Sequence, residues 1–295
     1  MSKSQIACSI TTTESTVVRL KTSGTSGYSL TACKTLQVGF ENLASGKGRR
    51  VLKKLERHLK EWQKEELALC VEPGTYLPLP AFFPADASPD ECKEYCRIEA
   101  GYFLTQPEKY SCDDTGYSDN SCSELHNKHI LLFYPDEQCK RALENFSTNH
   151  QIVFSGSPQK PLLYLSKFTK EAQVILELET NYVLLTISRK GQIEKFSFHH
   201  VKSREEREYF TIKVLAENPI CREKGVQVTG TMADKIMMAL IGKESSIALT
   251  TLIIPPSITI SNPQNFSISS ASAVKAISTA LMALAENEET TTFSR

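Results

Sequence analysis

Cysteine and histidine side chains gather between residues 92 and 126, and both residue types bind transition metals. Cys92 and Cys96 lie four residues apart on a predicted helix, so they share one of its faces. Cys112, Cys122 and His126 follow in a polar segment, and thiolate and imidazole groups are the usual ligands of zinc. The intervals between them do not match a zinc-knuckle pattern. We therefore expect ordinary thiols, buried or at the surface, and no metal.

Two further groups invite a chemical interpretation. Residues 112–120 are rich in carboxylate, amide and hydroxyl oxygens, but they lack the register and the closing Glu of a calcium-binding loop. A mobile, solvated loop is the simpler interpretation. His199 and His200 end a predicted strand with no Cys or Ser in a recognisable nucleophile turn nearby, which indicates a strand end at the surface.

Positive charge is densest over residues 47–60. A phosphate or a lipid headgroup is a candidate partner for this run. Glu56, Glu61 and Glu65 partly balance it, so the solvated face of an amphipathic helix is the simpler interpretation. The basic residues are Lys47, Arg49, Arg50, Lys53, Lys54, Arg57 and Lys60.

The composition excludes some classes of function. The 295 residues include 34 Lys or Arg and 34 Asp or Glu, so the chain lacks the net positive charge that drives non-specific binding to nucleic acid. The start shows no apolar run of signal-peptide length, and the most apolar stretch, 247–254, is too short to span a bilayer. We expect a cytoplasmic protein, not inserted in a membrane, with its nine cysteines reduced.

The helices and strands that carry these residues can be predicted from the spacing of apolar residues and from the positions of turn residues. Ser88, Pro89 and Glu91 form a helix-start signature, and the helix is expected to reach residue 101. In the first part, strands are predicted at 5–10, 15–21, 28–40, 66–71, 129–134, 152–154 and 162–165, and further helices at 46–63 and 136–146. In the second part, strands are predicted at 173–178, 181–188, 191–198, 225–229 and 246–254, and helices at 203–216, 232–241 and 270–285.

Each half thus begins with three consecutive strands and then alternates helices with strands. This order predicts an α/β protein of duplicated architecture, with two mixed five-stranded sheets flanked by helices and an interdomain cleft. The predicted divisions are a first subdomain at 1–168, a second at 169–285 and a polar C-terminal tail at 286–295.

Four features carry a likeness to a known family. They are the paired runs 6–10 and 16–20, the paired runs 175–179 and 182–187, the turn 227–234, and the helix 272–284. In this order they resemble the actin-like ATPase superfamily, with its duplicated ribonuclease-H-type fold. Within it, the chain looks like the PilM-type pilus-assembly proteins and related uncharacterised bacterial families.

The resemblance implies where a nucleotide would bind. In that superfamily the first strand of each phosphate hairpin ends in Asp and Gly: the Asp holds the metal, and the Gly lets backbone N–H groups approach phosphate. Here Thr11, Thr12 and Thr13 occupy the first hairpin, with neither Asp nor Gly. Glu177 and Glu179 occupy the second, without Gly, and either could replace an Asp as a Mg²⁺ ligand.

Gly230 corresponds to the glycine that meets the adenosine, although a glycine that closes a strand-to-helix turn is the simpler interpretation. Without the Asp-Gly pairs we expect no catalytic residues and a degenerate actin-like protein, a pseudo-enzyme that serves as a binding or scaffold module. The resemblance implies a protein partner, such as a short segment of a membrane protein in a pilus or secretion apparatus. The alternative is an active actin-like ATPase or kinase that uses ATP and Mg²⁺ with atypical phosphate loops.

Overall fold

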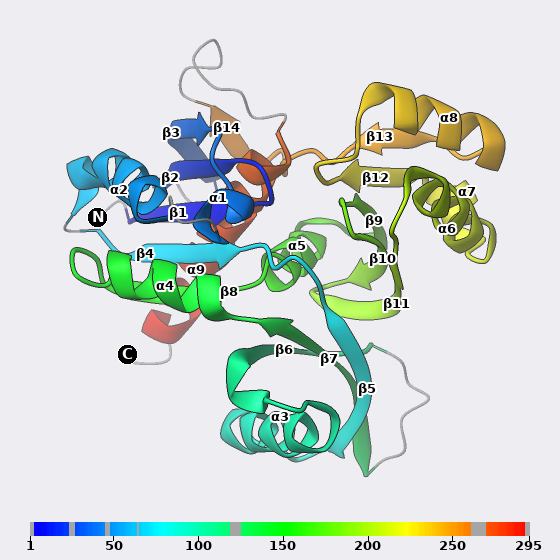
Figure 1. Cartoon of the computed structure of the whole chain (residues 1–295), viewed down its shortest axis with the longest axis horizontal. Coiled ribbons are helices and arrows are strands. Elements are labelled where there is room, and N and C mark those ends of the chain that lie inside the picture. Colours follow the sequence, from blue (N-terminus) through cyan, green and yellow to red (C-terminus); the bar gives the residue numbers. More distant parts are fainter. Residues whose placement is uncertain are drawn as a thin grey trace. The chain divides into compact units, whose positions relative to one another are not determined.

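The computed structural model describes residues 3–23, 27–44, 48–63, 65–118, 125–260 and 270–292, apart from the side chains of 44 and 287–292. Its contacts divide the chain into two compact units (Figure 1). Unit 1 comprises Met1–Pro73, Glu137–Leu165 and Ile253–Arg295. Unit 2 comprises Gly74–Asp136 and Ser166–Leu252. The chain therefore enters each unit more than once.

Unit 1 is built on a six-stranded sheet in the order β14-β3-β2-β1-β4-β8. Strands β1, β2 and β3 form an antiparallel meander, and β4 and β8 continue the sheet in parallel with β1. The strands are β1 (Ser4–Ile10), β2 (Ser15–Ser23), β3 (Gly27–Leu36), β4 (Leu67–Val71), β8 (Ile152–Gly156) and β14 (Ile258–Ile260).

Helices cover both faces of this sheet. Side chains of α1, α2 and α4 share a core with Ile6, Cys8 and Ile10 of β1. Because strand side chains alternate, the other face of β1 is free for α9, which packs on β1, β2 and β4. The helices are α1 (Phe40–Ala44), α2 (Gly48–Leu59), η1 (Lys60–Trp62), α4 (Glu137–Phe146), α5 (Gln159–Tyr164) and α9 (Ala271–Thr292); η3 (Leu165–Phe168) follows α5.

Unit 2 contains a five-stranded sheet in the order β11-β10-β9-β12-β13. Helices α6, α7 and α8 pack their apolar side chains on one face of it. The strands are β9 (Gln173–Leu178), β10 (Tyr182–Arg189), β11 (Gln192–His200), β12 (Val226–Thr229) and β13 (Leu249–Thr251), and the helices are α6 (Arg204–Ala216), α7 (Ile220–Lys224) and α8 (Lys235–Ser245).

The two sheets repeat one topology. In each, a three-stranded antiparallel meander is followed by two strands that run parallel to its first strand. The predicted duplicated α/β architecture is therefore confirmed. The details differ, because β14 adds a sixth strand beside β3 and because unit 2 carries another, smaller sheet.

The smaller sheet has the order β5-β7-β6 and is covered by α3 (Figure 1). Three aromatic rings attach it to the larger sheet of unit 2: the Tyr76 ring centroid lies 5.5 Å from that of Tyr182 and 6.2 Å from that of Phe198. Its elements are β5 (Leu77–Pro84), α3 (Pro89–Phe103), η2 (Pro107–Lys109), β6 (Tyr110–Gly116) and β7 (His126–Pro135).

Some predicted elements are wrong. Residues 162–165, predicted as a strand, belong to α5 and η3, because a short apolar run fits a buried helix as well as a strand. The supposed mobile loop from residue 112 forms β6 up to Gly116, paired with β7. The last helix continues past 285 to Thr292, and no Gly or Pro interrupts it.

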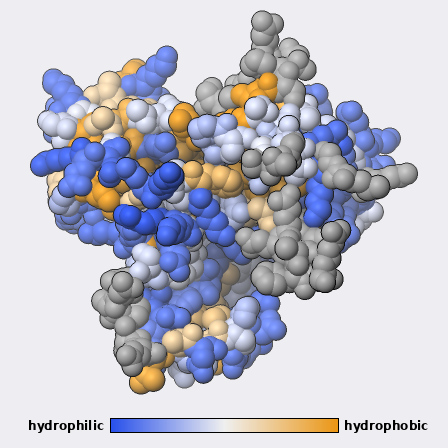
Figure 2. Space-filling view, turned by 180° about the vertical axis from the view of Figure 1, so that it is seen from behind, coloured by the Kyte–Doolittle hydropathy of each residue, from blue (hydrophilic) through white to orange (hydrophobic). Residues whose placement is uncertain are grey.

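On the face shown in Figure 2, hydrophobic side chains lie scattered among hydrophilic ones, as is normal for a folded protein. Within the described ranges, every helix is too short or too polar to cross a membrane.

Candidate functional site

The first hairpin turn, which holds Thr11, Thr12 and Thr13, is closed by its own backbone. The amide of Thr11 donates to the carbonyl of Glu14 over 2.9 Å, and the Thr11 hydroxyl donates to the same oxygen over 3.0 Å. Thr11 is buried, whereas Thr13 is exposed. Of the three hydroxyls expected to face a phosphate, that of Thr11 is therefore already engaged within the turn.

The start of α1 covers this turn. The amides of Phe40 and Glu41 donate to the carbonyls of Thr11 and Thr12 over 2.7 and 3.2 Å. Gly39 makes the approach possible, because a Cβ atom there would lie 2.5 Å from backbone atoms of the turn. The backbone of the first turn is thus packed directly against the beginning of a helix.

Glu14 completes the first site by binding the N-terminus of α9. Its Oε1 accepts hydrogen bonds from the Ser272 amide over 3.3 Å and from the Ser272 hydroxyl over 2.7 Å. The Ser272 hydroxyl also lies 2.6 Å from the hydroxyl of Thr16. A helix N-terminus favours an anion, and in this unit the anion is a carboxylate of the chain itself.

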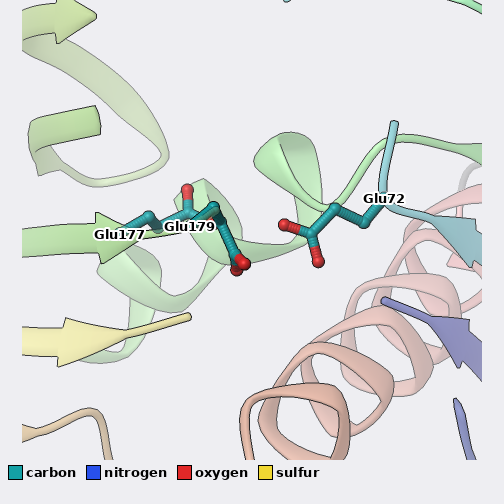
Figure 3. Close-up of side chains that lie close together, drawn as sticks. All are labelled: Glu72, Glu177 and Glu179. Carbon is teal, nitrogen blue, oxygen red and sulfur yellow. The ribbon is translucent and has the colours of Figure 1, made fainter. Parts of the chain in front are cut away.

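In the second hairpin turn, Glu179 also accepts hydrogen bonds from a backbone amide and a hydroxyl, but its partner, Thr231, lies before the start of α8. The Glu179 amide donates to the Tyr182 carbonyl over 3.0 Å, which closes the turn. Its Oε2 accepts from the Thr231 amide over 3.1 Å and from the Thr231 hydroxyl over 2.6 Å. Figure 3 shows Glu179 directly after β9, with Glu177 within that strand. Both glutamates are buried.

Arg207 of α6 fixes the backbone of the second turn. Its Nε donates to the Glu179 carbonyl over 2.9 Å, and its Nη2 donates to the Thr180 carbonyl over 2.8 Å. The residue is 6% exposed, and this burial lowers the pKa of the guanidinium group. Arg207 was not singled out from the sequence, because it lies in the first turn of a charged helix with four other Arg or Glu residues between 204 and 208.

Gly230 lies where the chain leaves β12 and passes the end of β9. Its φ is +110°, and a Cβ atom there would lie 2.3 Å from the Leu178 carbonyl oxygen. The amide of Met232 donates to that same oxygen over 2.9 Å. The glycine is therefore required by close backbone packing, whether or not a nucleotide binds.

A buried ion pair in unit 1 was also missed from the sequence. Lys275 Nζ lies 3.1 Å from Glu72 Oε2, and the two side chains are 0% and 1% exposed. Glu72 directly follows β4 (Figure 3), and its amide donates to the Ile10 carbonyl over 2.7 Å. The available signal was a lysine within the otherwise apolar and small-residue stretch of α9, which is buried throughout from 272 to 285.

The cysteine group does not assemble into a metal site in the described part of the chain. Cys92 and Cys96 lie on α3 and Cys112 on β6, but no three of these thiols and His126 come within ligand distance of one another. Cys122 lies outside the described residues. A hydrogen bond with Cys96, together with burial, raises the pKa of the Cys112 thiol. These thiols belong to the core between α3 and the small sheet.

The oxygen-rich segment and the histidine at the strand end, the remaining candidates, contact neighbouring side chains. Asp114, from the segment considered for calcium, lies 2.6 Å from His129 Nδ1 between paired strands. The His199 ring stacks on Phe210 with centroids 4.5 Å apart, and burial, together with nearby Lys213, lowers its pKa. Within the described residues, no hydrogen bond joins either of these histidines to a Cys or Ser side chain.

The arrangement at both turns has one chemical consequence. Glu14 already accepts a backbone N–H at the start of α9, and Glu179 already accepts the backbone N–H of Thr231. Each carboxylate also adds negative charge where a phosphate would be negative, and like charges repel. Each turn is thus satisfied internally.

Comparison with known proteins points to one fold. No protein-family model and no curated protein matches the sequence. Among solved structures, the chain is similar to a PilM–PilN type IV pilus biogenesis complex, with 13% identity, a TM-score of 0.71 and coverage of 95% of this chain and 98% of that one. It is also similar to a Bacteroides thetaiotaomicron protein with an actin-like ATPase fold and unknown function, with 12% identity, a TM-score of 0.50 and coverage of 94% and 95%.

The repeated strand order of the two units and these similarities over nearly the whole chain agree with each other. The chain has the duplicated fold of the actin-like ATPases.

Proposed function

We propose that this chain is a non-catalytic actin-like protein that binds a protein partner and serves as a scaffold in a membrane-associated assembly. The observation that carries the proposal is the use of Glu14 and Glu179 as internal anions at the two hairpin turns. At either turn, a phosphate group would have to displace the carboxylate and would gain no glycine-lined phosphate turn in return.

The partner class comes from the similar structure. PilM was determined in complex with PilN, in type IV pilus biogenesis. By analogy, the partner of this chain is a short cytoplasmic segment of a membrane protein, bound by strand addition or in a groove.

Sheet edges narrow the choice for strand addition. β5 is an edge strand, but Pro78, Pro80 and Pro84 remove three of its N–H donors, and prolines protect edges from further pairing. The other edge strands carry no proline. Beside β11, the residues that follow β6 already pair with Ile193 through a bridge from Tyr117. Among the remaining edges we favour β8, because its five residues offer a longer ladder than the three of β13 or of β14.

The test uses labelled peptides that copy the cytoplasmic termini of membrane proteins encoded beside this chain. Fluorescence anisotropy should show saturable binding of one peptide, with the same affinity in the presence and absence of ATP and Mg²⁺. A peptide that binds only when nucleotide is present would instead favour the alternative, an active ATPase. If none of the encoded termini binds, the scaffold proposal fails in this form.

A further inference from the structure

Helix α2 and the turn η1 that follows it lie at the surface of unit 1, with one side packed in its core. Val51, Leu52, Leu55 and Leu59 of α2 are buried in the core that this helix shares with the sheet. The apolar side of α2 is therefore committed to folding, and its opposite side is fixed toward solvent.

That opposite side is basic. At about 100° per residue, the six cations from 49 to 60 cover an arc of roughly 140° opposite the buried leucines. All six are exposed. We call them the α2 basic face: Arg49, Arg50, Lys53, Lys54, Arg57 and Lys60.

The acidic residues that seemed to balance this run mostly have other partners. Glu56 accepts a hydrogen bond from Asn149 Nδ2 over 2.7 Å, and Glu65 forms an ion pair with Arg19 of β2. Only Glu61 shares the exposed side. Across the described residues, none of the six cations takes part in an ion pair.

A neighbouring strand adds to the positive charge. Lys34 of β3 is exposed, and burial together with Lys34 lowers the pKa of His58 on α2. The chain as a whole has a formal net charge of zero. The positive potential is therefore local to this face and is not a property of the whole surface.

We infer that the α2 basic face binds the anionic surface of a lipid bilayer. Headgroups of anionic lipids present a plane of negative charge, and each Lys or Arg held near such a plane contributes about 1 kcal/mol of binding. Because the apolar side of α2 is in the core, the contact is electrostatic and the helix does not insert. A specific protein interface would also need apolar side chains at its centre, and the apolar side of α2 is already buried in the core.

This inference deepens the proposed function, since a scaffold for a membrane protein gains from being held at the bilayer. The vesicle experiment contains no partner protein, so its failure would leave the peptide test standing. Conversely, if no peptide binds but the vesicles do, the scaffold proposal fails and the membrane-binding inference stands.

The test is co-sedimentation of the full chain with vesicles. Binding should occur with vesicles that contain phosphatidylglycerol, should be absent with pure phosphatidylcholine, and should disappear at high salt, because salt screens charges at exposed sites. The variant Arg50→Glu/Lys53→Glu/Arg57→Glu should lose binding by on the order of 100-fold or more, as expected from the loss of three such contacts.

The matched control is Lys170→Glu/Lys202→Glu/Arg222→Glu, which makes the same change in net charge at exposed residues of unit 2. It should bind vesicles like the unchanged protein. Circular dichroism checks that both variants are folded; if the α2 variant is not, Arg50→Gln/Lys53→Gln/Arg57→Gln replaces it. Equal loss in the control, absence of binding to anionic vesicles, or tighter binding to duplex DNA or polyglutamate than to vesicles would each overturn the inference.

Discussion

Glu14 and Glu179 come from corresponding hairpin turns of the two units, and each carboxylate accepts a backbone N–H within its own unit. The sequence showed that the Asp-Gly pairs are missing from both turns. It did not show what replaces them, because Glu14 and its partner Ser272 are 258 residues apart. Contacts over such separations depend on the fold and leave no local pattern.

Gly230→Ala should destabilise the protein strongly. The new Cβ atom would meet the Leu178 backbone, and the backbone at φ +110° is strained for any residue with a side chain. We expect a loss of about 3 kcal/mol or more. Urea denaturation measures it.

Gly101→Ala is the matched control, because Gly101 lies in α3 and the added Cβ would meet no atom within 4 Å apart from its chain neighbours and the nearby backbone of its own helix. It should be neutral or stabilising by up to about 1 kcal/mol. A Gly230→Ala variant as stable as Gly101→Ala would show that the turn is not packed against β9.

Three helices contact the hairpin turns. Helix α1 covers the first turn, α6 supports the second through Arg207, and α9 presents its N-terminus to Glu14.

The sequence predicted α3 correctly from its capping box, which the structure confirms, because that signal is local. It did not predict β5, whose prolines are typical of turns, or β6, whose Asp and Ser residues are polar. Both segments are extended because each forms an antiparallel ladder with the apolar strand β7.

Arg207→Met should loosen the second hairpin. The substitution keeps much of the buried volume but leaves the carbonyls of Glu179 and Thr180 without their charged donor. The expected cost is about 2–4 kcal/mol. Thermal unfolding would measure it.

Arg204→Met, on the same helix, is the comparison. Arg204 is exposed and pairs with Glu208 one turn away, so its loss should change stability by less than about 0.5 kcal/mol. If the two variants behave alike, Arg207 does not support the turn.

Lys275→Met should cost about 3–5 kcal/mol, because it leaves Glu72 buried without its cation. The double variant Lys275→Met/Glu72→Leu should recover most of that loss, since a buried ion pair contributes little over apolar residues of similar size. A double-mutant cycle by urea denaturation provides the comparison. Additive losses in the double variant would show that the two side chains do not interact.

The whole molecule repeats one strand order twice, and this was predictable because each half opens with three consecutive strands. Membership of the two units was harder to anticipate. Residues 74–136 interrupt the chain of unit 1, yet their contacts place them in unit 2. The reason is the packing of Tyr76 on Tyr182 and Phe198, which no local pattern reveals.

For the whole molecule, we propose that the actin-like fold binds no ATP. Thermal unfolding of the full chain in a series of ATP and Mg²⁺ concentrations tests it most directly, because a ligand that binds only the folded state raises the melting temperature. A ligand at 100 times its dissociation constant stabilises by about 2.7 kcal/mol, which amounts to several degrees in a protein of this size. We predict a change of less than about 1 °C at any concentration. A rise that saturates with ATP and requires Mg²⁺ would show that the fold binds the nucleotide.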